Sequence, residues 1–277
     1  MHIGIMQGRL VPPVNNTIQA FPRDHWAEEF PRAAAAKLDC IEWIYDVYGA
    51  DVNPLCTDAG LARLQDLSAQ HGVSLRSLCA DYFMDQPLVR ATAGERRERL
   101  ERLEWLLGQC HQLGIGRIVL PFVDQSAMTT ASEEAQVVEC LRRVLPVAEQ
   151  CRLDLHLETS LAPEAFRAFL LRLPHDRLKV TYDAGNSAAL GYRPQEEFAA
   201  YGARIGSVHI KDRKRGGGTV ALGTGDTDFL AVFSGLKALH YTGDFILQVA
   251  RGIPGHEVSL AEHNRAFVVS HWSETAS

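Results

Sequence analysis

The feature that most restricts the fold of this chain is a repeated alternation between short apolar runs and longer segments with helical spacing of apolar residues. The short runs are rich in Val, Ile, Leu and aromatic residues, a composition typical of buried strands. Eight such runs lie at residues 3–7, 40–45, 74–80, 117–122, 154–158, 178–183, 207–211 and 245–249. Helical patterns follow them or lie between them, at about 26–38, 58–71, 94–113, 132–151, 163–173, 194–204, 228–240 and 257–271.

Eight consecutive strand–helix units favour one α/β domain, a (β/α)8 TIM barrel spanning residues 1–277, over an open doubly wound sheet. The hydrophobic content of 46% is ample for the core of a domain of this length. No GxGxxG motif follows the first run, so a dinucleotide-binding sheet is not indicated. The one flexible insertion that the sequence predicts is at 211–226, which contains three consecutive glycines.

Composition and charge argue against several functional classes. The formal charge is −6, with 28 basic and 34 acidic residues, which gives no electrostatic footprint for nucleic acid or an anionic membrane. No stretch approaches the roughly 20 apolar residues of a membrane span, and the start has no apolar signal region. The six cysteines form no CxxC pair, which argues against a zinc knuckle. We expect a cytoplasmic protein that acts on a small molecule, without a nucleic-acid or membrane partner.

Four polar residues lie at the ends of the last four apolar runs. They are Glu158, Asp183, His209 and Gln248. Because the chemistry of a (β/α)8 barrel lies at the carboxyl ends of its strands, we expect these side chains to converge. Each residue alone is more often a hydrogen-bonded residue of the barrel interior, but an oxygen-rich set with one imidazole suits a divalent metal ion. The role of Gln248 stays open between direct ligation and a hydrogen bond to a ligand or to substrate.

Further polar residues near the predicted strands are candidate substrate contacts. They are Gln7, Arg9, Glu42, Asp81, Asn186, Lys211, Arg213 and Arg251. The segment 211–215 is the strongest local concentration of positive charge, and it follows the seventh run, near the loops that often bind phosphate in this fold. It is suited to a substrate that carries a phosphate or a carboxylate. The alternative is a solvated loop whose basic residues contact nothing.

The chain resembles the xylose isomerase-like barrels, a superfamily of sugar and sugar-phosphate isomerases and epimerases that also includes endonuclease IV. The resemblance is carried by IEW at 41–43, LHLE at 155–158, YDAGN at 182–186, VHIKD at 208–212, LGTGDTDF at 222–229 and LQ at 247–248. It implies one divalent metal ion (manganese, magnesium, cobalt or zinc) held by a Glu, an Asp, a His and a second Glu. These ligands map to Glu158, Asp183, His209 and Gln248. The family commonly forms dimers or tetramers, so a homo-oligomer is a further expectation.

Two residues depart from the family pattern. Asn186 stands where the family often has His, and Gln248 stands where it has Glu. In the family's ketose 3-epimerases the strand-five and strand-eight carboxylates act on opposite faces of one carbon, whereas an amide cannot take a proton. A single carboxylate fits an aldose–ketose isomerase more easily than an epimerase, because the isomerase returns the proton to the same face.

The expected function is a divalent-metal-dependent isomerase or epimerase of a small sugar or sugar phosphate, which moves a proton next to a carbonyl through an enediolate. Glu158 and Gln248 are the expected catalytic residues, with Glu158 as the first candidate for the general base. Glu42, Asp81 and a metal-bound water are the alternatives for that base. Alternative functions are a lyase or dehydratase, a barrel that has lost catalysis and, with the least support, a nuclease of the endonuclease IV type.

Overall fold

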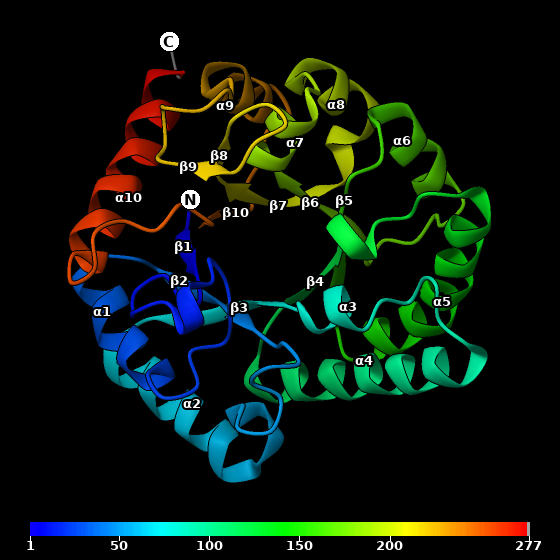
Figure 1. Cartoon of the computed structure of the whole chain (residues 1–277), viewed down its shortest axis with the longest axis horizontal. Helices are drawn as coiled ribbons and strands as arrows, with labels where there is room; N and C mark the ends of the chain where they lie inside the picture. Colours follow the sequence, from blue (N-terminus) through cyan, green and yellow to red (C-terminus); the bar gives the residue numbers. More distant parts are fainter. Residues whose placement is uncertain (276–277) are drawn as a thin grey trace.

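The computed structural model describes residues 1–275, in which parallel strands close into a barrel (Figure 1). The order around the barrel is β1-β10-β7-β6-β5-β4-β3-β2. The strands are β1 Ile3–Met6, β2 Cys40–Ile44, β3 Ser74–Cys79, β4 Arg117–Phe122, β5 Asp154–Thr159, β6 Leu178–Asp183, β7 Ile205–Ile210 and β10 Asp244–Leu247. Each strand overlaps one of the eight predicted apolar runs, so the predicted TIM barrel is confirmed.

Helices surround this barrel and cover the outer faces of its strands (Figure 1). In the described chain they are α1 Glu29–Ala35, α2 Asp58–His71, α3 Tyr82–Asp85, α4 Ala93–Leu113, α5 Ala131–Gln150, α6 Pro163–Leu171, α7 Ala184–Leu190, α8 Pro194–Tyr201, α9 Phe229–Ala238 and α10 Glu257–Glu274. The sequence analysis does not predict α3 and α7, which have four and seven residues and lie outside the segments with a helical pattern. Within residues 1–275, none of the helices combines the length and the apolar character that crossing a bilayer requires.

Local signals determine where the long helices begin and end. At the start of α4, the Thr92 side chain accepts a hydrogen bond from the Glu95 backbone while the Glu95 carboxylate accepts one from the Thr92 backbone. Thr130 and Glu133 form the same capping box at the start of α5. α4 ends at Gly114, whose φ of 70° is in the left-handed region that favours glycine. These caps satisfy free backbone groups, so each helix ends sharply and the chain returns to the next strand.

The segment that follows β7 is ordered, although the sequence predicts a flexible insertion there. It forms an antiparallel hairpin of β8 (Asp212–Arg213) and β9 (Thr219–Val220). The buried Asp212 carboxylate accepts from the backbone N–H groups of Gly225 (2.7 Å) and Thr227 (3.2 Å). A Cβ at position 225 would lie 2.0 Å from Asp212 Oδ1, so only glycine fits this close approach. The carboxylate therefore fixes the hairpin beside the carboxyl end of the barrel.

Candidate metal centre

Three side chains of metal-ligand type meet at the carboxyl ends of β5, β6 and β7. They are Glu158, Asp183 and His209, and one donor atom from each lies within 4.8 Å of the others. All three side chains are buried. Their convergence follows from strand pairing, because β6 lies between β5 and β7 and Asp183 is directly opposite His209 in the register.

The imidazole of His209 is oriented for ligation. Its Nε2 lies 2.7 Å from Glu42 Oε1, while its Nδ1 faces Glu158 Oε2 at 3.5 Å. Nδ1 is buried and has no hydrogen-bond partner among the described residues. A carboxylate that holds one ring nitrogen and leaves the other free toward a cluster of acids is the arrangement found around metal-bound histidines. The residues present therefore fit a divalent cation.

The electrostatic environment of His209 also favours a cation. Burial opposes a charged imidazole, but the negative charges of Glu42 and Glu158 and the hydrogen bond to Glu42 raise the pKa of His209 to about 10. Burial likewise opposes ionisation of Glu42, yet the charge of His209 and its hydrogen bond hold the pKa of that carboxyl below its ordinary value. The region around Nδ1 thus stabilises positive charge, whether a proton or a metal ion supplies it.

Asp183 serves the site and the local fold together. Its Oδ1 accepts the backbone N–H of Asn186 at 2.8 Å and so caps the start of α7. Its Oδ2 lies 3.3 Å from the ammonium group of Lys211. The same ammonium group donates to Oε1 of Gln248 at 3.0 Å. Gln248 is therefore next to the cluster, with its amide oxygen on Lys211, and its direct ligation stays a prediction.

Asn186 connects the cluster to the hairpin. Its side-chain amide donates to Glu158 Oε1 at 2.7 Å, and its Oδ1 accepts from Nη1 of Arg213 at 2.8 Å. One oxygen of Glu158 is thus held by a neutral donor while the other faces His209. Asn186, which stands where the family often has His, therefore orients Glu158, the carboxylate predicted to act as the general base.

A cavity of about 420 Å³ opens beside the cluster. Of the predicted site residues, those that line it are Glu158, Gln248, Asp81, Asn186, Lys211 and Arg213. The segments after β1 to β4 supply apolar groups to the lining (Ile18, Tyr48 and Met84) together with the carboxylates of Asp46, Asp81, Asp85 and Asp124. A small polar molecule in this cavity would therefore contact both charged and apolar groups.

Four other predicted substrate contacts do not line this cavity. Gln7 is completely buried and accepts the backbone N–H of Ile44, and Glu42 is completely buried against His209. Arg9 donates to the carbonyls of Ile18 and Val249, and Arg251 donates to those of Ile18 and Val11. Both arginines hold the loop after β1 in place.

Gln19 is a cavity residue that the sequence does not predict. Its Nε2 donates to Asp81 Oδ2 at 2.7 Å, and its Oε1 accepts from Gln248 Nε2 at 3.1 Å. It lies in the long loop between β1 and α1, where no periodic pattern or motif marks a position.

Burial raises the pKa of Asp81 to about 6, so this carboxyl can exchange a proton near neutral pH.

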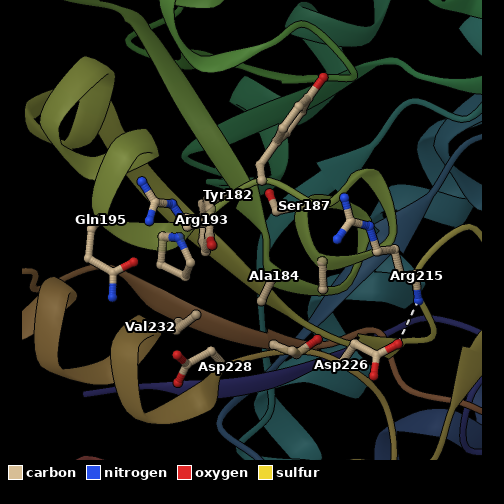
Figure 2. Close-up of a pocket in the computed structure, with 14 residues that line it drawn as sticks. Tyr182, Ala184, Ser187, Arg193, Gln195, Arg215, Asp226, Asp228 and Val232 are labelled. Carbon is tan, nitrogen blue, oxygen red and sulfur yellow. Dashed lines mark hydrogen bonds between the residues drawn. The ribbon is translucent and has the colours of Figure 1, made fainter.

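A second, larger cavity lies outside the barrel, between α7, α8, α9 and the loop before α9 (Figure 2). It has a volume of about 700 Å³. Three of its charged side chains are engaged with protein groups: Arg193 pairs with Glu196, the Asp226 carboxylate accepts the backbone N–H of Arg215 at 2.7 Å, and Asp228 accepts the backbone N–H of Ala231 at 2.9 Å. None of the three clustered ligands lines it. The smaller cavity is therefore the better candidate site despite its size.

The closed barrel and the buried Glu–Asp–His cluster at its carboxyl end define a TIM barrel with a candidate metal site. Residues 30–269 match the family model described as xylose isomerase-like TIM barrel. The chain therefore belongs to that family, as its motifs indicate. No curated protein sequence matches it.

Solved structures agree on the fold. L-ribulose 3-epimerase superposes with a TM-score of 0.78 at 20% identity, covering 99% of this chain and 95% of the other. The IOLI protein with a bound zinc atom superposes with a TM-score of 0.79 at 16% identity, and the match covers 100% of both chains. D-psicose 3-epimerase from Clostridium cellulolyticum H10, with D-tagatose, superposes with a TM-score of 0.73 at 16% identity, and the match covers 99% of both chains. At these identities the likeness establishes the fold alone.

Proposed function

We propose that the protein is a divalent-metal-dependent isomerase or epimerase of a small sugar or sugar phosphate. The observation that carries this proposal is the free Nδ1 of His209, held toward Glu158 and Asp183 next to a cavity that Glu158 also lines. Glu158, Asp183 and His209 would hold the metal ion, with Gln248 as a fourth ligand through its amide oxygen. When bound, the ion supplies Lewis-acid stabilisation of negative charge on an enediolate.

Glu158 is the residue that we assign to proton transfer. It lines the cavity, and the amide of Asn186 fixes one of its oxygens, which limits the orientations of the carboxylate. On the other side, Gln248 orients substrate hydroxyls but cannot take a proton. Removal and return of a proton by Glu158 on one face suits aldose–ketose isomerisation. Epimerisation needs a second group, and Asp81 is a second carboxyl on the same cavity.

Lys211 and Arg213 support a substrate with an anionic group. Both line the cavity, and both are anchored by protein acceptors, Lys211 by Asp183 and Gln248 and Arg213 by the carbonyl of Gly217. Because anchored cations lose little side-chain freedom on binding, they are good contacts for phosphate or carboxylate. This favours a sugar phosphate or sugar acid over an uncharged sugar.

One alternative has a structural observation behind it. The ammonium group of Lys211 lies between Asp183 and Gln248, so this chain carries its own cation at the edge of the cluster. A barrel that has lost catalysis would retain such an internal charge pair in place of a metal ion. A nuclease with several metal ions has less support, because the described residues contain one group of potential ligands.

Metal content and solvent hydrogen exchange test the proposal together. The protein is dialysed with excess Mn²⁺, its metal content is measured, and uptake of deuterium from D2O into ketoses and their phosphates is followed. L-ribulose and D-psicose are the first substrates, because epimerases of these sugars share the fold. We expect about one metal ion per chain and metal-dependent uptake.

Two sets of variants complete this test. Glu158→Gln abolishes uptake if the carboxylate moves the proton, whereas Glu164→Gln, on the exposed surface of α6, leaves it unchanged. The double variant Asp183→Ala, His209→Ala loses the metal. Full activity of Glu158→Gln would exclude Glu158 as the base, and absence of bound metal in the unmodified protein would place the non-catalytic barrel first.

A further inference from the structure

The opposite end of the barrel contains a cavity that the proposed reaction does not use. This basal cavity has a volume of about 270 Å³ and lies at the amino ends of the strands. Its lining includes Arg76, Arg117, Asp154, His156, Lys179 and Gly206. Several of them are cationic, although the chain as a whole has a formal charge of −6.

Two β-bulges shape the basal cavity. In the pairing of β2 with β3, Ile41 is opposite Leu75 and Glu42 is opposite Ser77, so Arg76 is the extra residue. In the pairing of β6 with β7, Gly206 is the extra residue in the same way. A bulge changes the direction in which a side chain points, and bulges occur often next to functional sites. Both bulges supply a residue to this cavity.

The positive charge in the basal cavity is only partly balanced. Asp244 pairs with both Arg76 (2.9 Å) and Arg117 (2.6 Å), so one carboxylate serves two guanidinium groups. Asp154, the carboxylate of the lining, pairs with Arg177 at 3.0 Å. The ammonium group of Lys179 forms no ion pair or hydrogen bond with any described residue. A small anion would therefore complete the charge balance.

Arg117 lines this cavity and has a buried donor without an acceptor. The residue is 8% exposed, and its Nη1 and Nη2 donate to Asp244 and Ser77. Its Nε is buried and has no hydrogen-bond partner in the described chain. A buried N–H group of a charged residue without an acceptor is unfavourable, so an acceptor supplied by a ligand would stabilise it.

His156 adds a second donor. Its Nδ1 lies 2.8 Å from the hydroxyl of Ser207, so Nε2 carries the hydrogen when Ser207 donates. Gly206 leaves room beside the ring, because a Cβ at that position would lie 2.8 Å from Nε2.

We propose that the basal cavity binds a small tetrahedral oxyanion of the phosphate class. The guanidinium of Arg117, the ammonium of Lys179 and the imidazole Nε2 of His156 donate to its oxygens, and Arg76 adds a further positive charge. The cavity is several times the volume of about 30 Å³ that one water molecule occupies in the liquid, so phosphate fits with residual water. This site is independent of the proposed reaction and of the metal ion.

Isothermal titration with inorganic phosphate at constant ionic strength tests this site. The unmodified protein is expected to bind phosphate saturably, with one site that depends on Lys179. Lys179→Met removes one charge without removing any protein contact, and it should weaken binding about tenfold or more. Lys37→Met, at an exposed position, makes the same change in net charge and should bind as the unmodified protein does.

A third variant separates this cavity from the one beside the cluster. Arg213→Met removes a cation that lines the other cavity, so it should weaken only phosphate bound there and leave the Lys179-dependent site unchanged. Loss of binding in Arg213→Met with retention in Lys179→Met would place the anion at the carboxyl end and overturn the proposal. Absence of saturable binding in the unmodified protein would overturn it as well. Glycerol 3-phosphate as a second titrant tells whether a free oxyanion or a phosphomonoester binds more tightly.

Discussion

His209 Nε2 lies 2.7 Å from Glu42 Oε1, and both side chains are completely buried inside the barrel. The two residues are 167 positions apart in the chain and come together through closure of the barrel. This contact determines which ring nitrogen is free for a metal ion. Several predictions about metal binding depend on it and on the neighbouring contacts.

Replacement of Glu42 by Gln should lower the affinity for Mn²⁺ or Zn²⁺ by about 10- to 100-fold. In the wild-type protein, the negative charge of Glu42 fixes the ring of His209 and increases the basicity of that ring. The amide of the variant removes this charge. Titration calorimetry measures the affinity. Glu29→Gln is the matched control, because Glu29 is another completely buried carboxyl that does not contact the cluster. Equal loss of affinity in both variants would contradict a specific role for Glu42.

Two substitutions of Asp183 should separate its two roles. Asp183→Asn keeps an oxygen that can cap α7 but removes the charge, so metal content should fall with little loss of stability. Asp183→Ala removes the cap as well and should cost about 1 kcal/mol more in free energy of unfolding of the metal-free protein. Chemical denaturation and metal analysis measure the two effects. Identical stability of the two variants would show that the bond to Asn186 contributes nothing.

Gln248→Glu should strengthen Mn²⁺ binding about tenfold, because a carboxylate is a better ligand for a hard cation than an amide. The new carboxylate would also be able to take a proton on the face of the substrate opposite Glu158. Gln125→Glu adds the same charge elsewhere on the cavity and should change the affinity much less. Weaker binding by Gln248→Glu would indicate that position 248 is outside the coordination sphere.

Glu29 should make the stability of the protein depend on pH. Burial raises its pKa from 4.5 to about 7, against the hydrogen bonds from the backbone of Leu10 and Gly8. Between these two values the unfolded chain has lost the proton that the folded chain keeps, so stability falls as the pH rises and then levels off above 7. The total fall from this group is roughly 3 kcal/mol at most.

Glu29→Gln should remove this part of the pH dependence. The amide oxygen still accepts both backbone N–H groups, but the side chain does not ionise. The free energy of unfolding, measured by denaturation from pH 4 to pH 8, should therefore decline less in the variant than in the unmodified protein. Parallel curves would mean that Glu29 is ionised in the folded state without penalty.

The barrel itself follows from the sequence, because its signals are local. Strand runs, helical periods and caps such as Thr92 and Glu95 act over a few residues and need no knowledge of distant parts of the chain. The short helices α3 and α7 lie in segments without such a signal, so they become visible only in the structure. The hairpin after β7 is ordered by Asp212 contacts that no local composition indicates.

The ligand cluster is determined in part by the sequence. Glu158, Asp183 and His209 end consecutive strands, and parallel pairing alone brings their side chains together. The orientation of each side chain was decided by tertiary contacts. Asn186 holds Glu158, and Lys211 engages both Asp183 and Gln248.

Only the tertiary structure places the residues that come from distant or irregular parts of the chain. Gln19 reaches the cavity from a long loop, and Glu42 lies beneath His209 because the barrel closes. Arg76 and Gly206 meet at the basal cavity because two bulges shift the register of their strands. Registers and loop paths depend on how the whole chain buries its surface, whereas strand ends depend on neighbours in sequence.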